Sequence, residues 1–122
     1  MNGRTFNLET PQPLLHLVAG MFTGNGGASP SSSTFTSDDI KSVTWTAAGT
    51  FTVELRHTWP SVVSIKGTCI DPTPDNNGMA VIVSETIATD GKFVLKYRVN
   101  NVDTNPDSTM KVGFIAILKN RR

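Results

Sequence analysis

The sequence predicts an all-β protein, an antiparallel β-sandwich or jelly-roll-like barrel of about seven short strands with a flexible N-terminal segment. Three observations support this prediction. Runs of β-branched and aromatic residues recur along the chain, several of them alternate apolar with polar residues, and turn-forming residues separate them about every ten positions. No segment requires a helix.

The N-terminal part of the chain is predicted to be an arm attached to the sandwich. Residues 1–13 are irregular and punctuated by prolines. The apolar segment 14–22 is interpreted as a strand, with a short helix as the alternative because it contains few β-branched residues. Residues 24–33 are rich in Gly and Ser, which is typical of a flexible linker. We therefore expect an N-terminal arm and linker over residues 1–35 and a β-sandwich domain over residues 36–122.

The clearest single element is a hairpin over residues 42–55. A short Ala-Ala-Gly connection joins two strands, and in each strand apolar and polar residues alternate. One face of the hairpin should therefore be buried and the other solvated. The residues expected on the buried face are Val43, Trp45, Phe51, Val53 and Leu55, and those expected on the solvated face include Thr50, Thr52 and Glu54.

Four further strands are predicted after the hairpin, at residues 62–70, 79–87, 92–99 and 112–118. The loop at 71–78 contains two prolines and an Asn-Gly turn. The last of these strands is apolar on both faces, which is typical of a central or doubly covered strand.

The composition excludes several classes of protein. At 122 residues the chain forms one domain, and its 11 basic and 10 acidic residues differ from the basic surplus of nucleic-acid-binding proteins. No apolar run approaches the roughly 20 residues of a membrane span. The segment 14–22 is interrupted by His16 and does not predict a signal peptide. The single Cys69 excludes an internal disulfide and favours folding in a reducing cytosol.

No enzyme active site is predicted. His57 is interpreted as a solvated residue at a strand end, and Cys69 as a small apolar residue inside a strand. No Gly-x-Ser-x-Gly motif is present. A hydrolase with a dispersed triad that uses His57 stays open as a minor alternative, because triad members converge only in space.

One loop repeats the opening of a calcium-binding motif, with Asp103, Asn105 and Asp107 at alternate positions. The rest of the motif fails, because Ser108 stands where glycine is needed and Phe114 where the bidentate glutamate is needed. We therefore expect no metal ion and no cofactor.

Candidate partner contacts come from three features. The segment 14–22 is apolar, Trp59 precedes Pro60 at a strand end and should be partly exposed, and strand 92–99 carries an outward basic row. A solvated row that keeps a sheet edge from pairing is the alternative for these basic residues. The candidates are Leu14, Leu15, Leu17, Phe22, Trp59, Lys92, Lys96 and Arg98.

The order of strand patterns resembles that of small virion structural proteins of tailed phages, which serve as capsid decoration (cement) proteins. The segments that carry the resemblance are Gly20–Thr23, Ser42–Thr46, Gly49–Leu55, Trp59–Ser64, Lys92–Leu95 and Val112–Asn120. The resemblance implies a non-enzymatic dimer or trimer on the capsid exterior, made in the host cytoplasm. Its partner would be the major capsid protein, with no nucleic-acid or membrane partner.

A second function class stays open beside this one. A carbohydrate-binding or host-adhesion β-sandwich module of a phage tail would use Trp59 as a stacking platform and the acidic loop 71–78 as the rest of its site.

Overall fold

The structure, a computed structural model, describes residues 15–73 and 77–119 and confirms the all-β prediction. The described residues form eight strands, one of them only two residues long, and two short helical turns. The strands are β1 (Leu15–Thr23), β2 (Ile40–Ala47), β3 (Thr50–Leu55), β4 (Ser61–Ile70), β5 (Gly78–Thr86), β6 (Lys92–Val99), β7 (Val102–Asp103) and β8 (Lys111–Lys119). The helical turns are η2 (Ser32–Thr34) and α1 (Ile87–Asp90).

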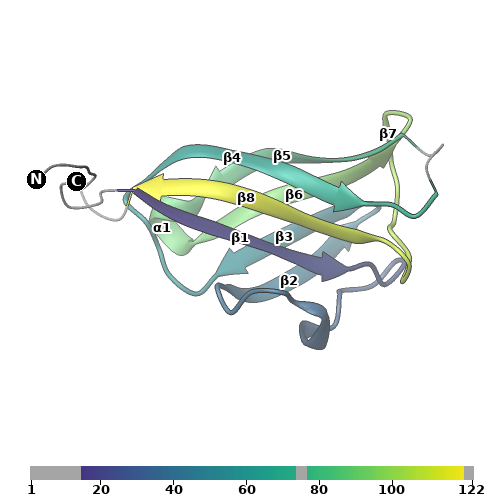
Figure 1. The fold of residues 1–122 in the computed structure, drawn as a ribbon, viewed down its shortest axis with the longest axis horizontal. Helices are drawn as coiled ribbons and strands as arrows, with labels where there is room; N and C mark the ends of the chain where they lie inside the picture. Colours follow the sequence, from purple (N-terminus) through teal and green to yellow (C-terminus); the bar gives the residue numbers. More distant parts are fainter. Residues whose placement is uncertain (1–14, 74–76, 120–122) are drawn as a thin grey trace, which may run out of the picture.

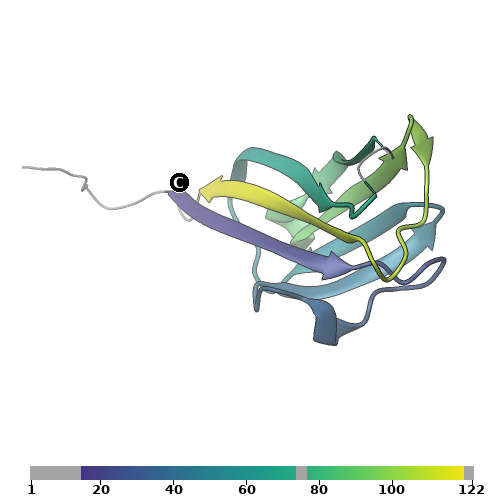
Figure 2. The same cartoon turned by 45° about the vertical axis from the view of Figure 1, so that its right-hand side comes forward.

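The strands form two antiparallel sheets that lie face to face (Figures 1 and 2). One sheet has three strands in the order β1-β8-β4. The other has the order β2-β3-β6-β5, with β7 added beside β6. In Figure 1 the three-stranded sheet is in front, and β8 runs between β1 and β4.

The core fills the space between the sheets, because each strand turns alternate residues toward the other sheet. Two aromatic pairs mark it: Phe93 and Phe114 have ring centroids 4.8 Å apart, and Phe22 and Phe51 have centroids 5.1 Å apart. The buried apolar residues are Val18, Phe22, Ile40, Val43, Phe51, Val53, Leu55, Ile87, Phe93, Leu95, Tyr97, Val112, Phe114, Ala116 and Leu118.

The predicted hairpin is confirmed as β2 and β3. Val43 pairs with Val53 and Trp45 with Phe51, so the expected apolar residues share the inner face. Trp45 is half-buried rather than buried. Gly49 in the turn has φ of +63°, a left-handed conformation that favours glycine.

The predicted boundary at residue 35 is not where the fold divides. Strand β1 pairs with β8 along its whole length, from Leu15 opposite Lys119 to Thr23 opposite Lys111. Every second residue of β1 faces inward, which places Val18 in the core. Within the described residues, this segment is therefore an edge strand of the sandwich.

The Gly- and Ser-rich residues 24–33, predicted to be a flexible linker, form a loop with specific hydrogen bonds. The backbone N–H groups of Gly24 and Gly26 donate to the carbonyl oxygens of Met110 and Pro106, each at 2.9 Å. A composition argument misses these contacts because they are made with a loop distant in the sequence.

Two smaller differences concern the segments around β5 and β8. The turn predicted after residue 87 is a single helical turn, α1, which buries Ile87 and ends at Gly91 with φ of +73°. Strand β8 is central, as its apolar pattern predicts, but it is covered on one face only. Ile115 and Ile117 on its other face remain exposed.

Candidate functional site

The outer face of the three-stranded sheet exposes apolar side chains along β1 and β8 and polar ones along most of β4, and we call it the apolar face. Its residues alternate with the core residues of β1, β8 and β4, and the strand register places them in rows. The outward residues are Leu15, Leu17, Ala19, Met21 and Thr23 of β1, Lys111, Gly113, Ile115, Ile117 and Lys119 of β8, and Ser61, Ser64, Lys66, Thr68 and Ile70 of β4.

Large aliphatic side chains on the apolar face are open to solvent. Leu17 is 65% exposed, and its register partner Ile117 is 37% exposed although it lies on the central strand. A bulge between Val62 and Ser64 adds the exposed Val63 at the edge of the same sheet. Single exposed apolar residues are ordinary, whereas a contiguous patch marks an interaction surface.

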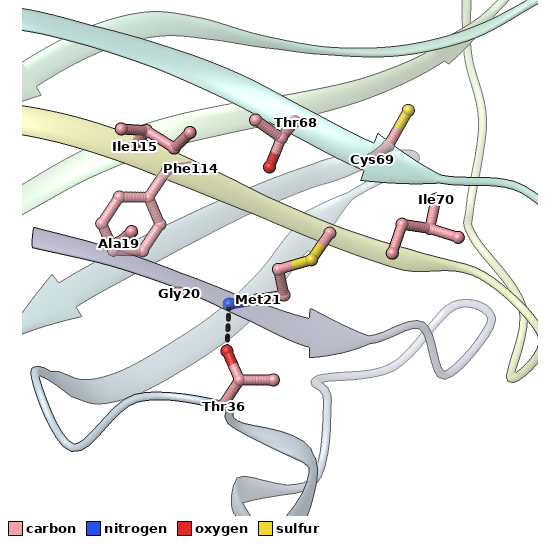
Figure 3. A pocket seen from close by; sticks show the side chains of 9 residues that line it. All are labelled: Ala19, Gly20, Met21, Thr36, Thr68, Cys69, Ile70, Phe114 and Ile115. Atoms are coloured by element: carbon pink, nitrogen blue, oxygen red, sulfur yellow. Dashed lines mark hydrogen bonds between the residues drawn. The ribbon is translucent and has the colours of Figure 1, made fainter.

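A hollow of about 410 Å³ opens on the apolar face (Figure 3). Figure 3 shows Met21 of β1 on one side and Thr68 of β4 on the other. In the register, Gly113 of β8 lies between these two residues. A side chain at Gly113 would collide with the backbone of Gly20 and approach Met21 Cγ to 2.7 Å. The close approach of β1 therefore requires glycine at this position.

The outer face of the other sheet is mainly polar along β2, β3 and β6, and we call it the polar face, although β5 and β7 of this sheet expose Met79, Val83 and Val102. A smaller hollow of about 230 Å³ on this face is lined entirely by polar and charged residues. They are Ser42, Thr44, Thr46, Thr52, Glu54 and Lys92. The expected alternation of β3, with Thr50, Thr52 and Glu54 on the more solvated side, is confirmed.

The predicted contact residues do not form one surface. Leu15 and Leu17 lie on the apolar face, whereas Lys92, Lys96 and Arg98 alternate with the core residues of β6 and lie on the polar face. The two groups are therefore on opposite sides of the sandwich.

Part of the basic row is neutralised within the chain. The Asp103 carboxylate accepts from Lys96 Nζ at 2.9 Å and from Arg98 Nε at 2.8 Å. These hydrogen bonds and charges lower the pKa of Asp103 below its ordinary range. Lys96 and Arg98 therefore stabilise the loop that contains β7.

Three further candidates have specific positions. The prediction for Phe22 was wrong, because the inward alternation of β1 buries this side chain completely against Phe51. Trp59 is half-buried, as predicted, and stacks on His16 with ring centroids 4.8 Å apart. Leu14 lies outside the described residues.

The residues considered for catalysis have ordinary surroundings. His57 is exposed, and no hydrogen bond in the described part of the chain joins it to a serine or a carboxylate. Cys69 is partly buried, and its Sγ donates to the carbonyl oxygen of Gly78 at 3.5 Å. Burial and the nearby charge of Asp71 raise the pKa of the Cys69 thiol, which opposes formation of a thiolate.

The calcium-like loop uses its three polar side chains for other contacts. Asp103 binds Lys96 and Arg98, whereas Asn105 Oδ1 accepts from Trp45. Asp107 accepts from the backbone N–H and the hydroxyl of Thr109. Among residues 15–73 and 77–119, no three His, Cys, Asp or Glu residues lie together as metal ligands would.

The described residues of the glycan site considered from the sequence lie far apart. Trp59 comes just before β4 and Asp71 just after it, at opposite ends of the strand (Figure 1). The ten residues of β4 are about 33 Å long in extended conformation. Among the described residues, Trp59 is therefore far from Asp71 and the start of this loop.

Sequence reasoning missed several residues of the apolar face, among them Met21, Ile115 and Ile117. The available signal was the apolar pattern of residues 112–118 on both faces. That pattern indicates a central strand, but only the register with β1 and β4 shows which outward residues remain uncovered.

Comparisons with known protein families, with curated proteins and with solved structures gave no match for this chain. Within the described residues, no helix has the length and apolar character needed to cross a bilayer. The described residues thus form an antiparallel β-sandwich in which the outer face of the three-stranded sheet exposes apolar side chains along β1 and β8, whereas the outer face of the other sheet is mainly polar along β2, β3 and β6.

Proposed function

We propose that this protein is a non-enzymatic structural protein of a tailed-phage virion, a capsid decoration protein that binds the outside of the major capsid protein lattice and stabilises it. The observation that carries the proposal is the apolar face, where Leu17, Ile115 and Ile117 are exposed side by side on a regular sheet. A protein-contact role accounts for such a patch. The resemblance of the strand patterns to decoration proteins supplies the class of partner.

The proposal places the protein on the capsid exterior after synthesis in the host cytoplasm, as a dimer or trimer. Any partner that binds only the assembled shell shifts the equilibrium toward that shell. Linked copies that bind neighbouring lattice positions also act together, so that weak individual contacts sum to firm attachment. A small β-sandwich with one exposed apolar face suits this kind of binding to a lattice.

The test uses shells of the cognate major capsid protein prepared without this protein. We expect the purified protein to cosediment with these shells at saturable stoichiometry and to raise their melting temperature in scanning calorimetry. Shells whose melting temperature is unchanged at saturating protein would contradict the proposal. Mass spectrometry of purified virions gives an independent check, because a decoration protein is present in far more copies than a tail-tip adhesin.

A further inference from the structure

We infer that the apolar face docks onto an acidic protein surface, one that has an apolar centre and carboxylates around it. The inference rests on the proposed function and deepens it, because it assigns the face that meets the shell. The polar face then points away from the shell.

The centre of the apolar face provides the apolar part of the contact. Leu17 and Ile117 form one row across β1 and β8, and Ala19 and Ile115 form the next. The hollow between Met21 and Thr68 lies one row further on. A partner side chain that enters this hollow would be surrounded mainly by apolar atoms, as buried anchors of protein interfaces are.

The charges on the same face are of one sign. The β1, β4 and β8 strands, which are described in full, contain three lysines and no aspartate or glutamate. Lys111 and Lys119 stand at the two ends of the central strand, and Lys66 stands on β4 opposite Ile115. All three are exposed, and no ion pair within the described residues involves them.

This arrangement selects the chemistry of the occupant. Lysines around an apolar centre complement a partner with carboxylates around an apolar centre, because opposite charges steer association and fix its register. A second copy of the same face would turn lysines toward lysines. Like charges across an interface oppose binding, so the pattern disfavours a symmetric pair formed through this face.

The size of the apolar face also argues against a stable pair held together by this face alone. Three strands of nine or ten residues cover about 30 Å by 14 Å, or about 400 Å² on each partner. The total of about 800 Å² is below the roughly 1,200 Å² typical of a stable protein pair. One such contact is weak, and firm attachment requires several copies bound to a repeating lattice.

The experiment measures binding of the purified protein to decoration-free shells of the cognate major capsid protein by cosedimentation. The face variant carries Leu17→Gln and Ile117→Gln, which remove apolar contacts without adding charge, and the matched control carries Thr44→Gln and Thr46→Gln on the polar face. All four positions are exposed, so each variant should fold, and circular dichroism checks this. We expect the face variant to lose about tenfold or more in affinity and the control to bind like the wild type.

A second variant tests the charges. Replacing Lys66, Lys111 and Lys119 with glutamine should weaken binding at low salt and make the remaining binding nearly independent of salt. Wild-type binding should fall as the salt concentration rises. Equal salt dependence in the wild type and the glutamine variant would overturn the acidic character assigned to the partner.

The other outcomes are separable. If the face variant binds shells normally and the polar-face variant does not, the inference is wrong but the decoration function stands. If the wild type does not bind shells, both the inference and the decoration function are wrong.

Sedimentation velocity of the free protein completes the test. Dissociation of a wild-type oligomer by Leu17→Gln and Ile117→Gln would show that a second copy covers this face and would overturn the inference, whereas an unchanged association state supports it.

Discussion

The indole Nε1 of Trp45 donates a hydrogen bond of 2.9 Å to Oδ1 of Asn105, a residue 60 positions further along the chain. The same amide oxygen accepts a second hydrogen bond of 2.8 Å from the backbone N–H of Gly49. One side chain of the long loop before β8 therefore holds both the first strand and the turn of the β2–β3 hairpin.

The first prediction concerns this shared acceptor. Asn105→Ala removes two hydrogen bonds and leaves the N–H of the buried Gly49 without its partner, so we expect a loss of about 1–3 kcal/mol in the free energy of unfolding. Urea denaturation measures it. Ser108→Ala, an exposed change in the same loop, is the control and should stay within about 0.5 kcal/mol of the wild type. An unaltered midpoint for Asn105→Ala would show that the hairpin does not depend on this contact.

The second prediction compares two glycines with nearly the same conformation. Gly49 has φ of +63° and Gly26 has φ of +61°. A Cβ at Gly49 would lie 2.6 Å from the carbonyl oxygen of Tyr97, whereas a Cβ at Gly26 meets nothing within 4 Å. Gly26→Ala should therefore lose only about 1 kcal/mol from its left-handed backbone, and Gly49→Ala clearly more. Thermal denaturation of both variants gives the comparison, and equal losses would contradict the close approach at Gly49.

The strands were predictable from the sequence where apolar and polar residues alternate with a period of two. The inward faces of β3 and β6 followed from the alternation around Phe51 and Leu95. The role of residues 24–33 was not predictable, because their hydrogen bonds join them to Met110 and Pro106, far away in the sequence. The apolar face was not predictable for the same reason, because its rows of side chains form only when β1 and β4 pair with β8.

The third prediction concerns the stability of the fold at acid pH and its dependence on Asp103. Hydrogen bonds from Lys96 and Arg98 lower the pKa of Asp103 in the folded protein. Stability from this group is therefore present above the ordinary aspartate pKa of about 4 and is lost as the pH falls through the lower folded value. We expect Asp103→Asn to destabilise the protein at pH 6 and to lose less additional stability than the wild type on going to about pH 3.

Urea denaturation at both pH values measures this difference. Asp107 and Asp90 also have lowered pKa values, so the Asp103→Asn variant should keep part of the acid sensitivity. Parallel pH profiles for the wild type and the variant would argue against a stabilising role for the ion pairs of Asp103.

The fourth prediction concerns alkaline pH and the single tyrosine of the chain. Tyr97 is completely buried, and its hydroxyl donates to Asp71 Oδ2 at 2.8 Å. Burial, together with the hydrogen bond and charge of Asp71, raises the pKa of Tyr97 far above its ordinary value. Stability is therefore full below the ordinary tyrosine pKa of about 10 and is lost as the pH rises above it, because only the unfolded chain ionises readily there.

Tyr97→Phe should lose about 1 kcal/mol at neutral pH, since it removes one hydrogen bond to Asp71, but it should lack the steep fall in stability above about pH 10. Cys69, whose pKa is also raised, acts in the same direction from a lower pH, so Cys69→Ala serves as the matched control and should keep the fall that Tyr97 causes. Because the wild type has one tyrosine, its phenolate absorbance reports on Tyr97 alone and should rise together with the loss of β-sheet circular dichroism. Phenolate formation in the folded protein, well before unfolding, would disprove the burial of this hydroxyl against Asp71.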